Sequence, residues 1–206
     1  LFEMPYLVQN REHMKRIEKE IFWPKMEPAA EAKGYKVLAL WENGFRHITN
    51  NARPINKPED LQGIKLRTPK GEWRVKMFQA YGANPTPMAF SEVFTALKTG
   101  VIDGQENPFA QIWSAKFQEV QKYLSLTGHV YTPAYVAVGK NKWEQLPADI
   151  RAEIEQIAKE TQDFVYETAA ALEDDLLEKL KAGGIAVNEA DKAAFVKASD
   201  GIYKEF

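Results

Sequence analysis

The chain has 206 residues, of which 45% are apolar and 27% charged, and its formal net charge is −2. This composition is ordinary for a globular protein and excludes a disordered chain, while the near-neutral charge gives no electrostatic reason to expect nucleic acid or an anionic membrane as partner. No run reaches the ~18 apolar residues that span a bilayer, and the absence of cysteine excludes disulfides and thiolate sites but leaves both the cytoplasm and the periplasm open.

The first residues, LFEMPYLVQN, lack an initiating methionine, a basic segment and a cleavage site of small residues. No signal peptide is therefore visible. Because these residues read like the middle of a domain, we expect the chain to be the later part of a longer protein.

The first third predicts a helix followed by two strands. Asn10 is suited to cap a helix over 11–22, and Gly34 is suited to end the helical region. Residues 35–41 (YKVLALW) read as a buried strand, and 42–63 as a polar connection with a short strand near 45–49. Residues 63–69 (GIKLRTP) read as a strand that stops before Pro69.

The middle third alternates between the two element types. We expect three helices. The first covers 72–82 and is ended by Gly82, the second covers 92–99, capped by Ser91 and followed by Gly100, and the third covers 109–121. Between them lie an extended segment at 83–88 and a short strand or turn at 101–108, and 123–139 reads as two strands with a break. This alternation is typical of an α/β fold.

From residue 147 to 183 apolar side chains keep helical spacing almost without interruption. Such a helix has ~35 residues and a length of roughly 50 Å, beyond the usual globular range. It is either one helix or two with a bend, and if continuous we expect it to brace two lobes.

Motifs for catalysis and metal binding are absent. The chain has no GxGxxG, Walker A, GxSxG or HExxH motif, and its three histidines have no neighbour at ligand spacing. The acidic loop with Asp103 and Glu106 lacks the ligand order of an EF-hand. We therefore predict no catalytic residue, no metal and no cofactor.

Features suited to binding a small anion follow or precede the predicted strands. Arg46 and Arg67 come at strand ends, Phe90 before a helix, and Asn107 after the 101–106 segment. Ligands of open α/β sheets sit outside the carboxyl ends of strands, where a guanidinium holds a carboxylate through two hydrogen bonds. From the residue pattern alone, two interpretations of Arg67 stay open: it lies either in solvent or at the mouth of a crevice.

Residues 67–108 carry a resemblance. The stretch GANPTPMAFSEVFTALKTGVIDGQENP is similar to the DctP-type solute-binding proteins of tripartite ATP-independent periplasmic (TRAP) transporters, and the likeness runs from the first residues to about Asn188. It implies a periplasmic protein of two α/β lobes, joined by crossing strands and braced by a long helix. We expect lobe I to hold 1–43 and 133–172, and lobe II 44–132 and 173–206.

The resemblance also implies site residues. Arg67 matches the family arginine that clamps a carboxylate in the interlobe cleft, and Arg46 matches a second arginine, with one extra residue between them. Phe90 matches the family aromatic, and Asn107, with Glu106 beside it, matches the asparagine. Trp73 occupies a variable loop that often sets substrate preference. His129 matches a family histidine that we interpret as structural.

These matches predict a receptor that captures an organic acid, without catalysis, and delivers it to TRAP membrane permease subunits. The alternative is an α/β enzyme acting on a small carboxylate with Glu106 or His129 as acid or base, and a periplasmic sensor domain is a third possibility. Sugar acids, C4-dicarboxylates, aromatic acids and keto acids all fit one clamp. Trp73 favours a larger hydroxy acid such as a uronate, and Arg46 suits either a second carboxylate or a polyhydroxy chain. Family members have roughly a hundred more residues at the N-terminus, which supply the other wall of the pocket.

Overall fold

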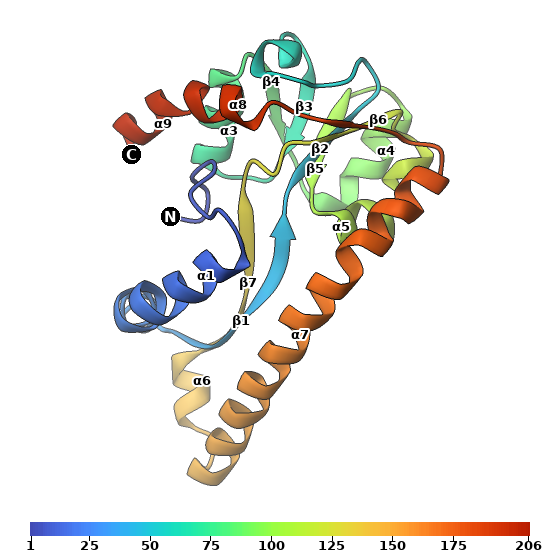
Figure 1. Cartoon of the computed structure of the whole chain (residues 1–206). Coiled ribbons are helices and arrows are strands. Elements are labelled where there is room, and N and C mark those ends of the chain that lie inside the picture. Colours follow the sequence, from blue (N-terminus) through green and yellow to red (C-terminus); the bar gives the residue numbers. More distant parts are fainter. The chain divides into compact units, whose positions relative to one another are not determined.

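The structure, a computed structural model, describes residues 1–206 and contains two compact units (Figure 1). Unit 1 comprises Leu1–Leu7, Phe45–Tyr131 and Glu173–Phe206, and unit 2 comprises Val8–Gly44 and Thr132–Leu172. The predicted division put residues 1–43 together, whereas the first seven residues pack in unit 1. There the Tyr6 hydroxyl donates to the Thr127 carbonyl at 3.0 Å and Glu3 pairs with Arg74.

Unit 1 is built on a six-stranded mixed sheet with the spatial order β4-β3-β5-β2-β6-β8. Its strands β3, β4 and β5 are parallel, β2 runs antiparallel to both β5 and β6, and β8 is parallel to β6. In chain order they are β2 (His47–Asn50), β3 (Lys65–Thr68), β4 (Asn84–Pro87), β5 (Gly104–Asn107), β6 (Tyr123–Leu126) and β8 (Ala186–Glu189). The proline-containing β4 lies at an edge, where a missing N–H costs no ladder bond.

Helices cover both faces of this sheet (Figure 1). One apolar cluster joins Ile48 and Leu66 of the sheet to Phe78 of α3 and Phe195 of α8. The other joins Leu124 to α4, α5 and Leu180 at the end of α7. The helices are α3 (Glu72–Ala80), α4 (Val93–Lys98), α5 (Phe109–Ser114), α8 (Lys192–Ala198) and α9 (Asp200–Glu205). The predicted α/β class is confirmed.

Unit 2 holds a two-stranded sheet and short helices. Its elements are α1 (Arg11–Ile17), a π-helical stretch (Glu18–Met26), α2 (Glu27–Glu31), β1 (Tyr35–Phe45), β7 (Tyr131–Gly139) and α6 (Lys140–Glu144), with the end residues Phe45 and Tyr131 assigned to unit 1. Leu38, Ala39, Trp143 and Ala158 form its apolar core.

The long helix is continuous, as α7 (Ala148–Ala182) with 35 residues. It belongs to unit 2 up to Leu172 and to unit 1 from Glu173. The helical spacing from 147 to 183 left one helix or two with a bend open, and the structure has a single uninterrupted helix. No helix contains an apolar segment long enough to cross a membrane.

Local predictions were confirmed in part. Asn10 caps α1, since its Oδ1 accepts from the His13 N–H at 2.8 Å, and Gly34, Gly82 and Gly100 take positive φ after their helices. The prediction of one regular helix over 11–22 was wrong after Ile17. There the backbone widens into the π-helical stretch, which contains Pro24, a residue with no N–H to donate.

Three other boundaries were wrong. Ser91 caps no helix. It lies inside a 3-10 turn (Phe90–Glu92), where the Glu92 side chain accepts from the Ala89 N–H. The strand predicted over 35–41 extends to Phe45 as β1, and the helix over 109–121 splits after Ser114, with Lys116 at φ 58°.

Candidate functional site

One end of the unit 1 sheet collects the predicted binding residues. Arg67 and Asn107 lie at the carboxyl ends of the parallel strands β3 and β5, and Arg67 is in register with Gln105. Because β2 is antiparallel to β5, with His47 opposite Asn107, the residue before β2, Arg46, reaches the same end. The strand order therefore brings side chains that are up to about 60 residues apart in the chain together at this end of the sheet.

Glu106 is the centre of a buried ionic cluster, which we call the Glu106 cluster and which consists of Arg46, Arg74, Glu106 and His129. The Arg46 Nε donates to Glu106 Oε2 at 2.6 Å and its Nη2 donates to Oε1 at 2.9 Å. The Arg74 Nη1 donates to Oε2 at 2.8 Å, and His129 Nε2 lies 3.0 Å from the same oxygen. Both carboxylate oxygens are thus engaged, and Glu106 has no exposed surface.

The charge states in this cluster follow from its contacts. Burial alone would raise the pKa of Glu106, but the charges of Arg46 and Arg74 and the hydrogen bonds from His129 and Arg46 hold that pKa well below its usual range. Burial lowers the pKa of His129, against the opposing pull of Glu106. Glu106 is therefore ionised and His129 neutral at pH 7, with its Nδ1 2.8 Å from the Thr127 hydroxyl.

Arg67 is as buried as Arg46 but has no carboxylate partner. Its Nε and Nη2 both donate to the Met88 carbonyl, at 3.1 and 2.8 Å, and its Nη1 makes no hydrogen bond to the protein. Burial lowers the pKa of Arg67 to about 10, with Glu106 opposing and Arg46 and Arg74 adding to the shift. The guanidinium is therefore charged at neutral pH, and part of its hydrogen-bonding capacity is unused.

Phe90 and Asn107 flank the two arginines. The Phe90 ring is 43% exposed and its centroid lies 5.9 Å from Arg67 Cζ, within the range of a cation–π contact. The Asn107 Oδ1 accepts from Arg46 Nη2 at 3.0 Å, and its Nδ2 donates to Gln105 Oε1 at 2.6 Å. These bonds fix the orientation of the amide, and the ring supplies an apolar wall.

Trp73 is placed elsewhere. Its indole packs edge-on against Phe206, with centroids 5.1 Å apart, and the Lys76 Nζ lies 4.7 Å from its ring centre. The structure thus brings Arg46, Arg67, Phe90, Glu106 and Asn107 together, and it gives Trp73 no bond or ring contact with any of them.

Arg74 is the residue that sequence reasoning missed. It is 1% exposed and bridges Glu106 to Glu3, whose Oε1 lies 3.1 Å from Arg74 Nη2. A signal was available, because Arg74 shares the buried face of α3 with Met77 and Phe78, three and four residues on. A charged residue on an apolar helix face requires a buried partner.

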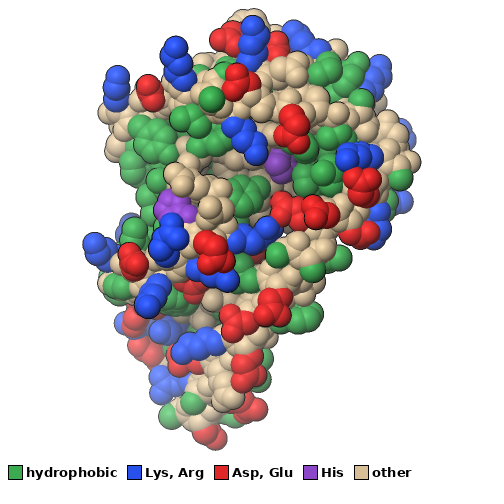
Figure 2. Space-filling view, in the orientation of Figure 1, with side chains coloured by type: hydrophobic (Ala, Val, Ile, Leu, Met, Phe, Trp, Pro, Cys, Tyr) green, Lys and Arg blue, Asp and Glu red, His purple; other side chains and the backbone are tan.

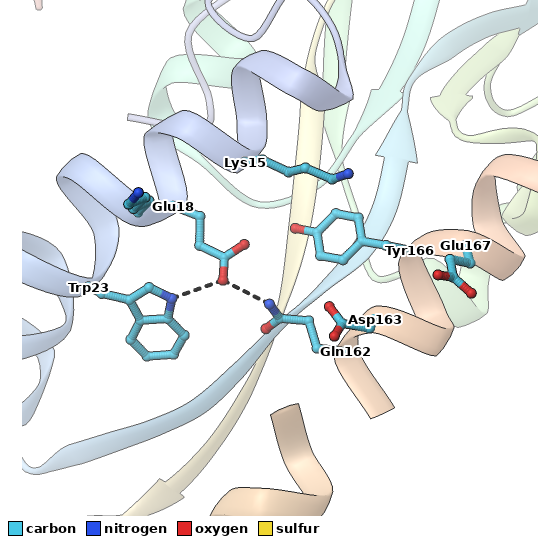
Figure 3. Close-up of a pocket in the computed structure, with 8 residues that line it drawn as sticks. Lys15, Glu18, Trp23, Gln162, Asp163, Tyr166 and Glu167 are labelled. Atoms are coloured by element: carbon cyan, nitrogen blue, oxygen red, sulfur yellow. Dashed lines mark hydrogen bonds between the residues drawn. The ribbon is translucent and has the colours of Figure 1, made fainter. Parts of the chain in front are cut away.

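Unit 2 has a recess of about 480 Å³ of its own (Figure 3). At its inner wall Glu18 Oε1 accepts from the Trp23 indole at 2.9 Å and from Gln162 Nε2 at 2.8 Å. The other lining side chains mix both signs of charge, being Lys15, Lys19, Asp163, Tyr166 and Glu167. Two lysines (Lys15 and Lys19) face three carboxylates (Glu18, Asp163 and Glu167), so the recess offers no excess positive charge for an anion, unlike the end of the unit 1 sheet.

Charge is also mixed on the face of the molecule shown in Figure 2. Figure 2 shows basic and acidic side chains interspersed on the face in view, without a large patch of one sign. Nowhere in the chain do three or more histidine or acidic side chains meet in an arrangement that could hold a metal ion. Among the buried arginines Arg46, Arg67 and Arg74, only Arg67 has no carboxylate partner.

Comparison with known proteins connects this chain to a family. A family model described as bacterial extracellular solute-binding protein, family 7 (DctP) matches residues 1–206. The 2,3-diketo-L-gulonate-binding periplasmic protein YiaO of Escherichia coli is 37% identical over 199 residues, which are 96% of this chain and 61% of that protein. The sialic acid-binding periplasmic protein SiaP of Vibrio cholerae is 35% identical, with 98% and 63% covered. The chain thus spans about three fifths of these relatives' length.

Solved structures similar to this chain are also periplasmic solute-binding proteins. A TRAP periplasmic solute-binding protein from Sulfitobacter with bound β-D-galacturonate superposes with a TM-score of 0.95 at 32% identity, over 99% of this chain and 68% of that one. One from Polaromonas bound to D-erythronate gives a TM-score of 0.95 at 36% identity, over 100% and 68%. Both bound molecules are hydroxylated monocarboxylates.

Proposed function

The chain belongs to the bacterial extracellular solute-binding proteins of family 7, the DctP family, and from this membership we propose that it forms part of the periplasmic receptor of a TRAP transporter. The receptor captures a small organic acid and delivers it to TRAP permease subunits in the membrane. The observation that carries the proposal is Arg67, a buried and charged guanidinium without a carboxylate partner, beside an exposed phenyl ring.

Arg67 is proposed to clamp the carboxylate. Its Nη1 and the second N–H of Nη2 form one edge of the planar fork, and that edge is suited to a bidentate contact. The Met88 carbonyl holds the opposite edge through Nε and Nη2. Phe90 would cover the carbon chain of the ligand, and Asn107 and Arg46 would contact its other oxygens. Glu106 would act by holding Arg46 in place.

This family consists of solute receptors rather than enzymes. The alternative of an enzyme with Glu106 or His129 as acid or base is therefore not retained. The geometry gives the same answer, because the Glu106 oxygens are both occupied and its pKa is held low, so it is a poor proton acceptor.

The proposal is tested by calorimetric titration of the full-length protein with a panel of organic acids, and with neutral sugars as controls. One acid class should bind, and Arg67→Ala should weaken that binding by at least about a hundredfold, because the carboxylate loses a charged partner in a desolvated site. Arg53→Ala, which removes an exposed arginine of the same unit, is the matched control. Equal affinity in the two variants would remove Arg67 from the site.

A further inference from the structure

Three donors converge on one oxygen of the Glu106 carboxylate. Oε2 lies 2.6 Å from Arg46 Nε, 2.8 Å from Arg74 Nη1 and 3.0 Å from His129 Nε2. Arg46 and Arg74 bring fixed positive charges to this oxygen, because a guanidinium does not lose its proton in a protein. His129 is the one donor of the three whose charge can change near neutral pH.

His129 has the hydrogen-bonding partners that a charged ring needs. In its neutral form it donates from Nε2 to Glu106, and its Nδ1 accepts from the Thr127 hydroxyl, 2.8 Å away. A hydroxyl can reverse this bond and accept from a protonated Nδ1. Burial lowers the pKa of His129, and the charges of Arg74 and Arg46 lower it further. Burial and charge, rather than a missing partner, therefore keep the ring neutral.

The surroundings of His129 contain few other charges. The charged and titratable groups that act on the ring are Glu106 of β5, Arg46 before β2, Arg74 of α3 and His47 of β2. His47 is itself neutral at pH 7, because burial is the largest of the effects that lower its pKa to about 3. On the α3 side the Phe78 ring lies edge-on to His129, with centroids 5.2 Å apart. Without Arg74, the ring would face one cation instead of two.

Arg74 is poorly satisfied as a purely structural residue. It is 1% exposed and shares the buried face of α3 with Met77 and Phe78. Its Nη1 and Nη2 reach Glu106 and Glu3, but its Nε is buried without a hydrogen-bond partner in the protein. Such a group costs stability. What Arg74 supplies in return is a permanent positive charge at Glu106.

We propose that Arg74 is a positioning residue, whose guanidinium takes the place at Glu106 Oε2 that a charged His129 would otherwise fill. Arg74 thereby keeps the charge of the Glu106 cluster, and with it the hold on Arg46, constant when the pH changes. The inference rests on the proposed function in one respect, namely that Arg46 and Arg67 serve an acid ligand. Because Arg74 is among the charges that act on Arg67, its loss also lowers the positive potential at the ligand, and a charged His129 restores it.

The first test needs no ligand. Arg74→Gln keeps a polar side chain but removes the charge, so the His129 ring should become protonated between about pH 8 and 5.5, where it stays neutral in the wild type. The nitrogen chemical shifts of the ring, measured by NMR on the full-length protein, separate the charged ring from the neutral Nε2–H tautomer. Arg74→Lys keeps the charge and should leave His129 neutral. Arg53→Gln, which removes an exposed arginine of the same unit, is the matched control and should also leave it neutral.

The second test is the pH dependence of acid binding. The probes are D-erythronate and β-D-galacturonate, which are bound in two of the similar structures, titrated calorimetrically at about pH 8 and about pH 5.5. Wild type should bind with the same Kd at both pH values, because a carboxylate stays ionised throughout this range. Arg74→Gln should bind at least about fivefold more weakly at the higher pH and regain most of that loss at the lower pH, as His129 becomes charged. A merely structural loss would be equal at both.

The outcomes separate this inference from the receptor function. A His129 ring that stays neutral in Arg74→Gln, or an affinity loss that does not change with pH, overturns the role of Arg74 and leaves the receptor function standing. Protonation of His129 in the wild type above about pH 5.5 overturns it as well, without any variant. If the wild type binds no organic acid, the receptor function falls, and the ring titration still decides the role of Arg74.

Discussion

The end of β3 and the segment between β1 and β2 each hold a buried arginine, and the two arginines differ in what balances them. Arg46 and Arg67 are both 4% exposed and lie at the same end of one sheet. Arg46 has both oxygens of Glu106, whereas Arg67 has one backbone carbonyl. Burial alone therefore does not distinguish the two arginines, whereas charge compensation does, and it is the basis on which we propose Arg67 as the ligand-binding one.

This difference has an energetic meaning. A compensated buried charge resists the removal of either partner, because the survivor is left unpaired in a low dielectric. An uncompensated buried charge costs stability in the ligand-free protein and is repaid when an anion binds. The two arginines should therefore respond oppositely to mutation.

The largest effect is expected at the centre of the compensated side. Glu106→Gln leaves Arg46 and Arg74 without their common anion, so the free energy of unfolding should fall by about 3–5 kcal/mol. Urea unfolding monitored by circular dichroism measures it. The exposed Glu72→Gln should change it by no more than about 0.5 kcal/mol, and a similarly small loss for Glu106→Gln would show that the Glu106 cluster does not compensate Arg46.

Acid should lower the free energy of unfolding through His47, the residue next to Arg46. Burial, with the charges of His129 and Lys192, lowers the pKa of His47 from 6.5 to about 3. Below pH 6.5 the unfolded chain therefore binds a proton that the folded chain does not, and the stability present above pH 6.5 is lost as pH falls toward 3. The slope is about 1.4 kcal/mol per pH unit.

Protonation of Glu106 should lower the free energy of unfolding further at lower pH. Its pKa is held below the usual carboxyl value, so its contribution is present above pH ~4.3 and is lost as pH falls through the folded pKa. Urea unfolding between pH 7 and 4 should show a shallower decline in His47→Gln than in wild type, with His13→Gln as control. A flat wild-type profile would contradict the buried neutral histidine.

Substitution of a side chain next to Arg67 should weaken acid binding more than substitution of one elsewhere in unit 1. Phe90→Ala removes the ring next to Arg67 and should weaken acid binding by about tenfold, or ~1.4 kcal/mol. Trp73→Ala removes a ring packed on Phe206 and should weaken it less than about twofold. Comparable losses in calorimetry would instead return Trp73 to the site.

The smallest effect distinguishes the arginines most directly. Arg67→Met, without ligand, should leave the free energy of unfolding unchanged or raise it by about 1 kcal/mol, since it removes a buried charge that lacks an anion. Arg46→Met should lower it, because Glu106 loses a two-point partner. Destabilisation by both, in the same urea titration, would mean that Arg67 has structural compensation as well.

Much of the fold was predictable because its signals are local. Asn10 as helix cap and Gly34 and Gly82 after helices were expected and are observed, and the helical spacing of residues 147–183 is observed as the single helix α7, one of the two alternatives left open. The failures were local as well. The π-helical stretch around Pro24 and the 3-10 turn at Ser91 depend on packing and on backbone hydrogen bonds that residue type alone does not specify.

The sequence predicted that most of the candidate site residues lie close together, but it did not predict their charge partners. Arg46, Arg67, Phe90 and Asn107 were named from strand ends and from family resemblance, and they do lie at one end of the sheet. Glu106 was also named, but not as the anion that neutralises Arg46. Arg74 escaped notice because it lies within a helix, where its neighbours in sequence are not its partners.

The sequence by itself determined the α/β class, the long helix, the family and the arginine at the end of β3. Only the tertiary structure decided which arginine has a carboxylate partner and which has none. Pairing of β2 with β5 brings Arg46 to Glu106, 60 residues away, and α3 brings Arg74 to the same carboxylate, 32 residues away. Net charge at a buried site is a sum over groups that meet in space, and the Coulomb energy depends on their distances there, not on their spacing along the chain.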